Sequence, residues 1–187
     1  MIETLRLILR PWREADRDPW AAMNADPEVF YWLGGPIDRA TSDAAVDRYD
    51  SRFRADGYCR WAVERRADGA LVGSCGVMPI LDGGAPEGFE IGWRLARAAW
   101  GQGYAAEAAR AALDDAFDRV GLAEVISYTA ASNLRSRAVM ERIGMARASD
   151  RDFEHPALPP DHPLRAHVVH VARRSGAATG SEPSEGW

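Results

Sequence analysis

Two glycines between a strand-like segment and a long helix constrain this chain more than any other feature. Residues 89–95 alternate between apolar and polar or small side chains, and Gly101 and Gly103 precede a helical pattern over residues 104–120. Glycine lets the backbone turn so that consecutive N–H groups point into one concavity. The first N–H groups of a helix lack partners within it and carry partial positive charge. The sequence therefore predicts an anion site, with a diphosphate as its natural ligand.

The helix that follows the glycines has one face of small side chains. Its apolar positions repeat at intervals of three and four residues, while the charged side chains fall elsewhere. The small face consists of Ala105, Ala108, Ala109, Ala112, Ala116 and Val120. Because alanine is small, we expect this helix to lie close to a sheet. Gly121 ends it.

The remaining segments predict a mixed α/β fold around one sheet. Alternation predicts strands at residues 4–10, 58–65, 70–78, 89–95, 124–129 and 167–172, with Leu5, Leu7 and Leu9 on one face of the first. Helices are predicted at residues 16–25, 41–55, 104–120 and 133–143, the second capped by Thr41 or Ser42. Residues 29–36 and 81–88 are expected to form loops, and residues 153–163 an irregular segment. We expect a single domain over residues 1–174 and a disordered tail at residues 175–187.

Charge and cysteine content exclude several classes of function. The formal net charge is −5, and all 23 basic residues are arginines. A nucleic-acid-binding surface needs the opposite sign of charge. Cys59 and Cys75 match neither a disulfide framework nor a zinc motif, which favours a reducing compartment. No apolar run approaches the ~18 residues of a membrane span, and the first residues lack the core of a signal peptide. We expect a cytoplasmic protein without nucleic-acid or membrane partners.

Two kinds of diphosphate site compete for the glycine segment. Gly101, Gly103 and Ala106 satisfy the dinucleotide fingerprint G-x-G-x-x-[G/A]. In a Rossmann unit, however, the first strand runs almost directly into the first glycine. Here several residues separate Leu95 from Gly101, and too little chain follows for the rest of a dinucleotide domain. The P-loop sequence G-K-[ST] is also missing, which disfavours nucleotide triphosphate hydrolysis.

Three motifs in order carry a family resemblance. Arg97-Ala-Ala-Trp-Gly-Gln-Gly-Tyr-Ala105 resembles the coenzyme A diphosphate loop of the GNAT superfamily of N-acetyltransferases. The later segment from Ser132 to Met145 is similar to the family's N-x-x-[SA]-x-x-[VL]-x-x-x-x-G-[FM] helix. Residues 4–11, Thr-Leu-Arg-Leu-Ile-Leu-Arg-Pro, resemble the first strand of the branch that acetylates ribosomal-protein N-termini. The resemblance spans about residues 4–172.

The resemblance implies where acetyl-CoA binds. Two parallel strands, residues 89–95 and 124–129, would splay apart, and the cofactor would enter the wedge between them. Gly92 would form a bulge, because an extra residue there bends a strand and frees main-chain groups. Asn133 would contact the cofactor or cap its helix, and both roles are compatible. The implied cofactor-binding residues are Trp93, Leu95, Gly101, Gln102, Gly103, Tyr104, Ala105 and Asn133.

The resemblance also implies a pair of catalytic side chains. Glu90 would act as the base that accepts the amine proton, directly or through water. The alternative for Glu90 is an outward-facing charge on a strand. Many family members carry a tyrosine on the later helix as general acid, but that position here is Met140. Ser136 is the replacement that we consider, and its alternative is a serine that bonds the local backbone.

The expected function is acetyl transfer from acetyl-CoA to a primary amine within a ternary complex. The acceptor would be a protein α-amino group or a small-molecule amine, and the protein is a candidate homodimer, as many relatives are. The alternative is a coenzyme A-binding sensor that has lost catalysis, which Met140 favours. Residues 30–32 and 153–163 would line the acceptor pocket or simply pack beneath a loop.

Histidine and cysteine chemistry is disfavoured. The four histidines are His155, His162, His167 and His170, and their spacing matches no helical or hairpin pair, so no metal site is expected. His167 and His170 are expected to occupy strand or surface positions. Cys75 is interpreted as a buried structural thiol rather than as an acetyl carrier.

Overall fold

The computed structural model describes residues 1–81 and 86–174. The predicted tail, residues 175–187, and residues 82–85 of the predicted loop lie outside the described residues. The helices are α1 (Arg17–Asn24), α2 (Pro27–Phe30), α3 (Arg39–Asp56), α4 (Tyr104–Asp118) and α5 (Leu134–Arg142). The strands are β1 (Ile2–Glu3), β2 (Leu7–Arg10), β3 (Arg60–Arg65), β4 (Leu71–Pro79), β5 (Phe89–Leu95), β6 (Glu124–Ala130), β7 (Ala146–Arg147), β8 (Phe153–Glu154) and β9 (Ala166–Arg173).

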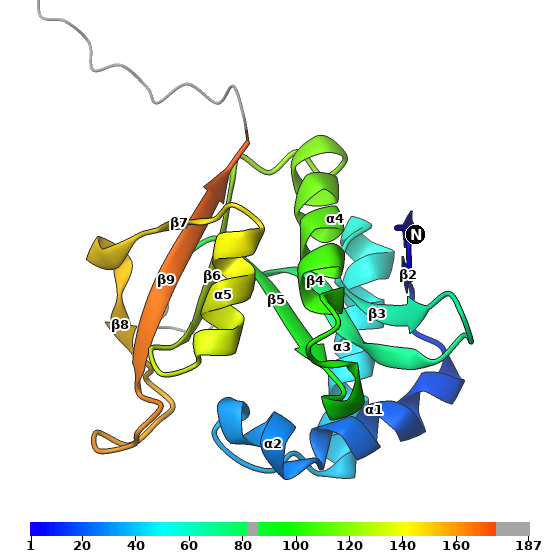
Figure 1. The fold of residues 1–187 in the computed structure, drawn as a ribbon, viewed down its shortest axis with the longest axis horizontal. Helices are drawn as coiled ribbons and strands as arrows, with labels where there is room; N and C mark the ends of the chain where they lie inside the picture. The colour runs from blue at the N-terminus through cyan, green and yellow to red at the C-terminus, as the bar shows by residue number, and fades with distance from the viewer. Residues whose placement is uncertain (82–85, 175–187) are drawn as a thin grey trace, which may run out of the picture.

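These elements confirm the predicted mixed α/β fold. The described strands form one sheet in the order β1-β2-β3-β4-β5-β6-β9-β7, with β8 paired to β9. Figure 1 shows α4 on one face of this sheet and α1 with α3 on the other. The alanine face of α4 packs on the sheet as predicted, because Ala108, Ala109, Ala112 and Ala116 are all buried. No described helix is long and apolar enough to cross a membrane.

The two central strands splay apart. In the described sheet, β5 and β6 form the parallel pair, and their register contains the single match Glu90↔Ile126. Beyond that point the strands diverge, as Figure 1 shows. Glu90 therefore lies where the wedge between the strands begins. This is the geometry that the sequence motifs imply.

Gly92 does not form the expected bulge. β4 and β5 pair residue for residue from Gly73↔Leu95 to Pro79↔Phe89, with Gly92 opposite Gly76. The register shift in this part of the sheet lies instead at Val63 and Glu64, between β3 and β4. Gly92 instead leaves room for the side chain of Arg60.

Several predicted boundaries are wrong for local reasons. α3 is capped by Asp38, whose carboxylate accepts from the Thr41 N–H at 2.7 Å, so Thr41 and Ser42 lie inside the helix. The predicted loop at residues 29–36 is partly helical, because Asp26 caps α2 and a 3₁₀ turn follows at Tyr31–Leu33. Leu5 is 88% exposed, since β2 begins only at Leu7.

Candidate functional site

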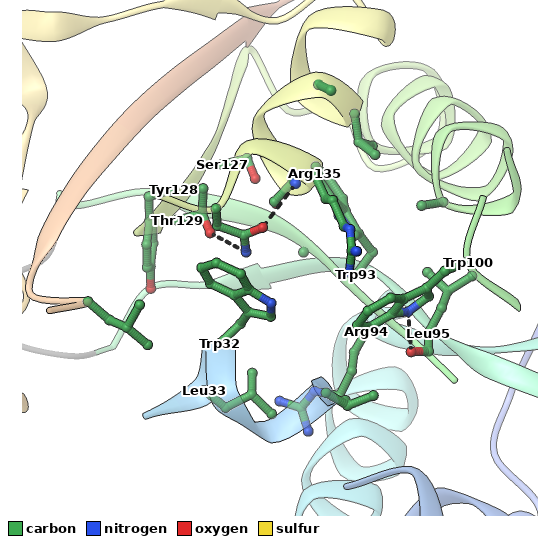
Figure 2. A pocket seen from close by; sticks show the side chains of 18 of the residues that line it. Trp32, Leu33, Trp93, Arg94, Leu95, Trp100, Ser127, Tyr128, Thr129 and Arg135 are labelled. Carbon is green, nitrogen blue, oxygen red and sulfur yellow. Dashed lines mark hydrogen bonds between the residues drawn. The ribbon is translucent and has the colours of Figure 1, made fainter. Parts of the chain in front are cut away.

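A cavity of about 1030 Å³ opens beside the diverging strands β5 and β6. Figure 2 shows its walls, with Trp93, Arg94 and Leu95 from β5 and Ser127, Tyr128 and Thr129 from β6. Every predicted site residue except Gln102 lines it. The predicted residues that do so are Glu90, Trp93, Leu95, Gly101, Gly103, Tyr104, Ala105, Asn133 and Ser136.

The main chain of β5 turns hydrogen-bonding groups toward the wedge. Hydrogen-bonded and non-hydrogen-bonded pairs alternate along an antiparallel ladder. Because the Ala96 N–H donates to Val72 across the β4 edge, the odd-numbered residues of β5 point their N–H and C=O groups toward β6. Trp93 thus offers main-chain groups to a ligand in the wedge. The Leu95 carbonyl is already occupied by the Trp100 Nε1 donor at 2.9 Å (Figure 2).

The glycine loop presents free donors at the start of α4. Gly101 and Gly103 both have a left-handed backbone, with φ of 75° and 79°, and Gly103 is the N-cap of α4. No side chain of the described residues caps this end of α4. The N–H groups of its first turn, from Tyr104 onward, therefore lack intrahelical partners and face the cavity end of the helix. Such a cradle fits a diphosphate.

The loop is held in place by the N-terminal segment. The Glu107 carboxylate in α4 accepts hydrogen bonds from Thr4 Oγ1 at 2.6 Å and from the Arg6 N–H at 2.8 Å. The Arg6 guanidinium bonds the same carboxylate and donates to the Gln102 carbonyl at 2.9 Å. Gln102 turns its side chain to the Ala98 carbonyl, at 2.9 Å. The motif resembling the family's first strand thus fixes the glycine loop.

Glu107 is ionised at neutral pH. Burial raises the pKa of Glu107, but the hydrogen bonds from Thr4 and Arg6 outweigh this effect and leave its pKa below the ordinary value. Because the folded-state pKa is lowered, the contact stabilises the fold above the ordinary carboxylate range. That contribution is lost as the pH falls through the lowered pKa.

We predict that Arg6→Met weakens acetyl-CoA binding about threefold to tenfold, because the loop loses a charge-assisted contact worth about 1 kcal/mol. Isothermal titration calorimetry measures this change. Arg13→Met is the matched control, because Arg13 pairs with Glu64 away from the loop. Equal affinities of the two variants would contradict the role assigned to Arg6.

Gly92 makes room for an arginine that holds Glu90. A Cβ atom at Gly92 would lie 2.4 Å from Arg60 Nη2, so only glycine leaves space for this guanidinium. Arg60 Nη2 donates to Glu90 Oε2 at 2.8 Å, and both side chains are mostly buried. Burial lowers the pKa of Arg60, but the Glu90 carboxylate raises it, and the net pKa lies above the ordinary value. The ion pair fixes the orientation of the Glu90 carboxylate at the apex of the wedge.

Comparisons with known proteins agree with this geometry. Residues 6–146 match the family model described as "Acetyltransferase (GNAT) domain". The chain belongs to this family. It is 32% identical, over 85% of its length and 70% of the relative's, to the FsC-acetyl coenzyme A-N(2)-transacetylase of Aspergillus fumigatus.

Solved GNAT acetyltransferase structures share the whole fold. The acetyltransferase from Agrobacterium tumefaciens strain C58 has a TM-score of 0.74 and 29% identity, covering 92% of this chain and 94% of that one. RimJ of Mycobacterium smegmatis, solved in complex with CoA-disulfide, has a TM-score of 0.69 and covers 89% of this chain and 81% of that one. At 20% identity, the likeness to RimJ shows the fold alone.

The second GNAT motif helix supplies both a cap and a hydroxyl. Asn133 Oδ1 accepts from the Ser136 N–H at 3.2 Å, and Asn133 Nδ2 donates to Thr129 Oγ1 at 3.1 Å. Asn133 is therefore the cap of α5, while it also lines the cavity. Ser136 lines the cavity one turn into the helix. Met140 is fully buried in the core, and its thioether has no proton to donate.

Arginines near Trp100 were not predicted as site residues. Arg97 and Arg135 place their guanidinium groups 5.1 and 4.8 Å from the Trp100 ring centroid. Arg97 also pairs with Glu28 at 2.8 Å, whereas Arg135 forms no ion pair with the described part of the chain. Both line the cavity close to the start of α4. Arg97 belongs to the glycine-loop motif itself, whereas only the folded arrangement reveals Arg135, since α5 and the glycine loop are distant in sequence.

The expectation that the histidine spacing matches no hairpin pair is wrong. β8 and β9 pair with Phe153 opposite His167, and this brings the His155 and His167 rings to 4.9 Å between centroids. Both histidines line the cavity, as do Leu158 and Trp32 from the two segments considered for the acceptor pocket. Burial lowers the pKa of His167, and its Nδ1 lies 3.0 Å from the Arg165 carbonyl. A neutral imidazole is therefore a second candidate base.

His170, Cys59 and Cys75 lie away from the cavity. His170 is 2% exposed in β9, which agrees with its interpretation as a strand residue. Burial raises the pKa of both thiols to about 12, so they stay protonated at neutral pH. A protonated thiol is a poor nucleophile. In the described residues, no group of three or more metal-ligating side chains comes together.

Proposed function

We propose that this GNAT acetyltransferase moves an acetyl group from acetyl-CoA to a primary amine by direct transfer in a ternary complex. The observation that carries the proposal is the position of Glu90, at the single residue pair where β5 and β6 meet. A carboxylate at the apex of the wedge lies beside the place where a thioester threaded between the strands would end. The transacetylase name of the Aspergillus fumigatus relative supports the same chemistry.

The cavity has the parts that acetyl-CoA binding requires. The uncapped amides of α4 would hold the diphosphate, and the main-chain groups of Trp93 would pair with the pantetheine amides. Trp100 and the guanidinium of Arg135 border the same end of the cavity. When bound, acetyl-CoA supplies the acetyl group as an activated thioester.

Residues of this chain then transfer protons and orient the reacting groups. The amine nitrogen attacks the carbonyl carbon, a C–N bond forms, the C–S bond breaks and the thiol leaves. Glu90, oriented by Arg60, takes the proton that the amine must lose, directly or through water. Ser136 lies on the α5 side of the cavity and is the proposed donor to the leaving sulfur.

Thiol release with a panel of amines tests the proposed function. The enzyme should bind acetyl-CoA and release coenzyme A thiol only when an accepted amine is present. Peptides with free N-termini belong in the panel, because the first-strand motif resembles the branch that acetylates ribosomal proteins. Binding without release for every amine would favour the sensor alternative. Absence of binding would overturn both functions.

A further inference from the structure

The cavity wall around Glu90 holds more positive than negative charge. Glu90, Gly92 and Arg94 share one face of β5, because side chains alternate along a strand. Arg60 reaches over Gly92 to Glu90, so these two charges satisfy each other. Arg94 lines the same cavity and forms no ion pair with any residue in the described part of the chain. One guanidinium is thus left without a counter-ion.

Neutral groups hold Arg94 in place. Its Nη1 donates to Asn24 Oδ1 at 2.6 Å, and Asn24 is itself fixed by a 2.9 Å hydrogen bond to Ser42 Oγ. The guanidinium lies 5.1 Å from the Trp20 ring centroid, in cation–π contact. The Nε atom is buried and has no hydrogen-bond partner among the described residues. An amide and an indole ring orient the charge but do not neutralise it.

An unpaired buried charge is costly unless a ligand compensates for it. Burial lowers the pKa of Arg94 to about 10, so the group remains cationic at neutral pH despite its surroundings. A partly buried charge without a counter-ion destabilises the protein. In Figure 2 the Arg94 side chain extends from β5 toward the segment that carries Leu33, along the cavity. The arrangement matches a site that is completed by an anion.

We propose that the amine acceptor also carries a carboxylate, and that this carboxylate binds Arg94 while the amine lies near Glu90. The planar guanidinium fork matches a carboxylate, whose single negative charge balances that of Arg94. The inference rests on the proposed acetyltransferase function and deepens it. It disfavours cationic acceptors such as polyamines, which Arg94 would repel. It favours amino acids and other amines that end in a carboxylate.

Matched acceptor pairs test the carboxylate. Each of four amino acids is compared with its carboxamide: glycine, L-alanine, β-alanine and γ-aminobutyrate. The rate of coenzyme A thiol release is divided by the concentration of the unprotonated amine, because the amine pKa differs between acid and amide. We expect the acid of at least one pair to have a kcat/KM about tenfold to a hundredfold above its amide. 2-Aminoethylphosphonate distinguishes a carboxylate from a phosphonate site, and a better turnover of the phosphonate than of β-alanine would overturn the carboxylate assignment.

Variants of Arg94 test whether this side chain causes the preference for the acid over its amide. Arg94→Met should reduce the acid-to-amide ratio to about one, mainly through KM, and Arg94→Lys should restore part of it because the charge is kept. Arg54→Met is the matched control, since Arg54 is an exposed arginine on α3 that pairs with Asp50. It should leave the ratio unchanged. Thermal melting and acetyl-CoA titration show whether each variant is folded.

A binding measurement separates this inference from the proposed function. Trp20 contacts Arg94, so tryptophan fluorescence of the coenzyme A-saturated protein should respond to β-alanine and not to its carboxamide. Carboxylate binding without thiol release would overturn the proposed function and support the Arg94 site. Equal responses and equal turnover for acid and amide would overturn the Arg94 site and leave acetyl transfer intact.

Discussion

Replacing Glu90 by glutamine is expected to lower kcat about a hundredfold, while acetyl-CoA affinity stays within about twofold of the wild type. A positioned base typically contributes two to four orders of magnitude, and glutamine keeps the shape but cannot accept a proton. Glutamine can still accept from Arg60, so the local fold should survive. The limb of the pH profile on which the rate rises with pH should also disappear or move. Steady-state thiol release across pH measures both effects.

The control for Glu90 is a second ion-paired glutamate of the sheet. Glu124 in β6 pairs with Arg151 and Arg173, and it does not line the cavity. Glu124→Gln should retain wild-type kcat. His167→Gln completes the set, because His167 is the other candidate base in the cavity. Full activity of Glu90→Gln together with loss of activity in His167→Gln would transfer the role of base to His167.

Replacing Gly103 by valine is expected to weaken acetyl-CoA binding about a hundredfold. Gly103 has φ of 79°, and a β-branched residue in the left-handed region costs about 1–3 kcal/mol. A Cβ atom at this position has room, with the nearest contact, Arg6 Nη2, at 3.5 Å, so the effect is one of backbone conformation. The loop should relax to another conformation and turn its N–H groups away from the cavity. Calorimetry of acetyl-CoA binding measures the loss.

The opposite end of the same helix provides the matched control. Gly121 follows α4 with φ of 82°, and an added Cβ would meet no described atom within 4 Å. Gly121→Val should therefore lower the melting temperature about as much as Gly103→Val, yet leave acetyl-CoA affinity unchanged. If both variants lose affinity equally, general destabilisation explains the result, and the glycine loop has no specific role in acetyl-CoA binding.

Local patterns were sufficient to predict the fold and the glycine loop that lines the cavity. The glycine loop and the alanine face of α4 are encoded within one continuous segment, so periodicity and turn chemistry reveal them. The splayed strands were implied by the family resemblance that three motifs carry. The position of Glu90 at the start of the wedge, and those of Ser136 and Asn133 on the cavity wall, are as the motifs imply, although their roles remain proposals.

The part of the cavity around Arg60, Arg94 and the two histidines depends on contacts that sequence spacing does not encode. Gly92 looked like a bulge, but its small size accommodates Arg60 from a strand two places away in the sheet. Arg94 is recognised as a charge without a counter-ion only when the structure shows that its hydrogen-bond partner is the neutral amide of Asn24. His155 and His167 meet because β8 and β9 pair across an intervening loop. Each of these features joins separate segments of the chain, between which no periodic pattern operates.

The proposed function requires that main-chain N–H groups at the start of α4 bind the diphosphate of acetyl-CoA. Titration of the protein with acetyl-CoA, followed by ¹H–¹⁵N NMR, tests this binding at the amide resonances of residues 101–106. With acetyl-CoA, the amide protons of Gly103, Tyr104 and Ala105 should shift strongly downfield, whereas S-acetylpantetheine, which lacks the diphosphate, should leave them in place. Saturating acetyl-CoA that shifts the Arg135 side-chain resonance but none of these amides would contradict diphosphate binding by the start of α4.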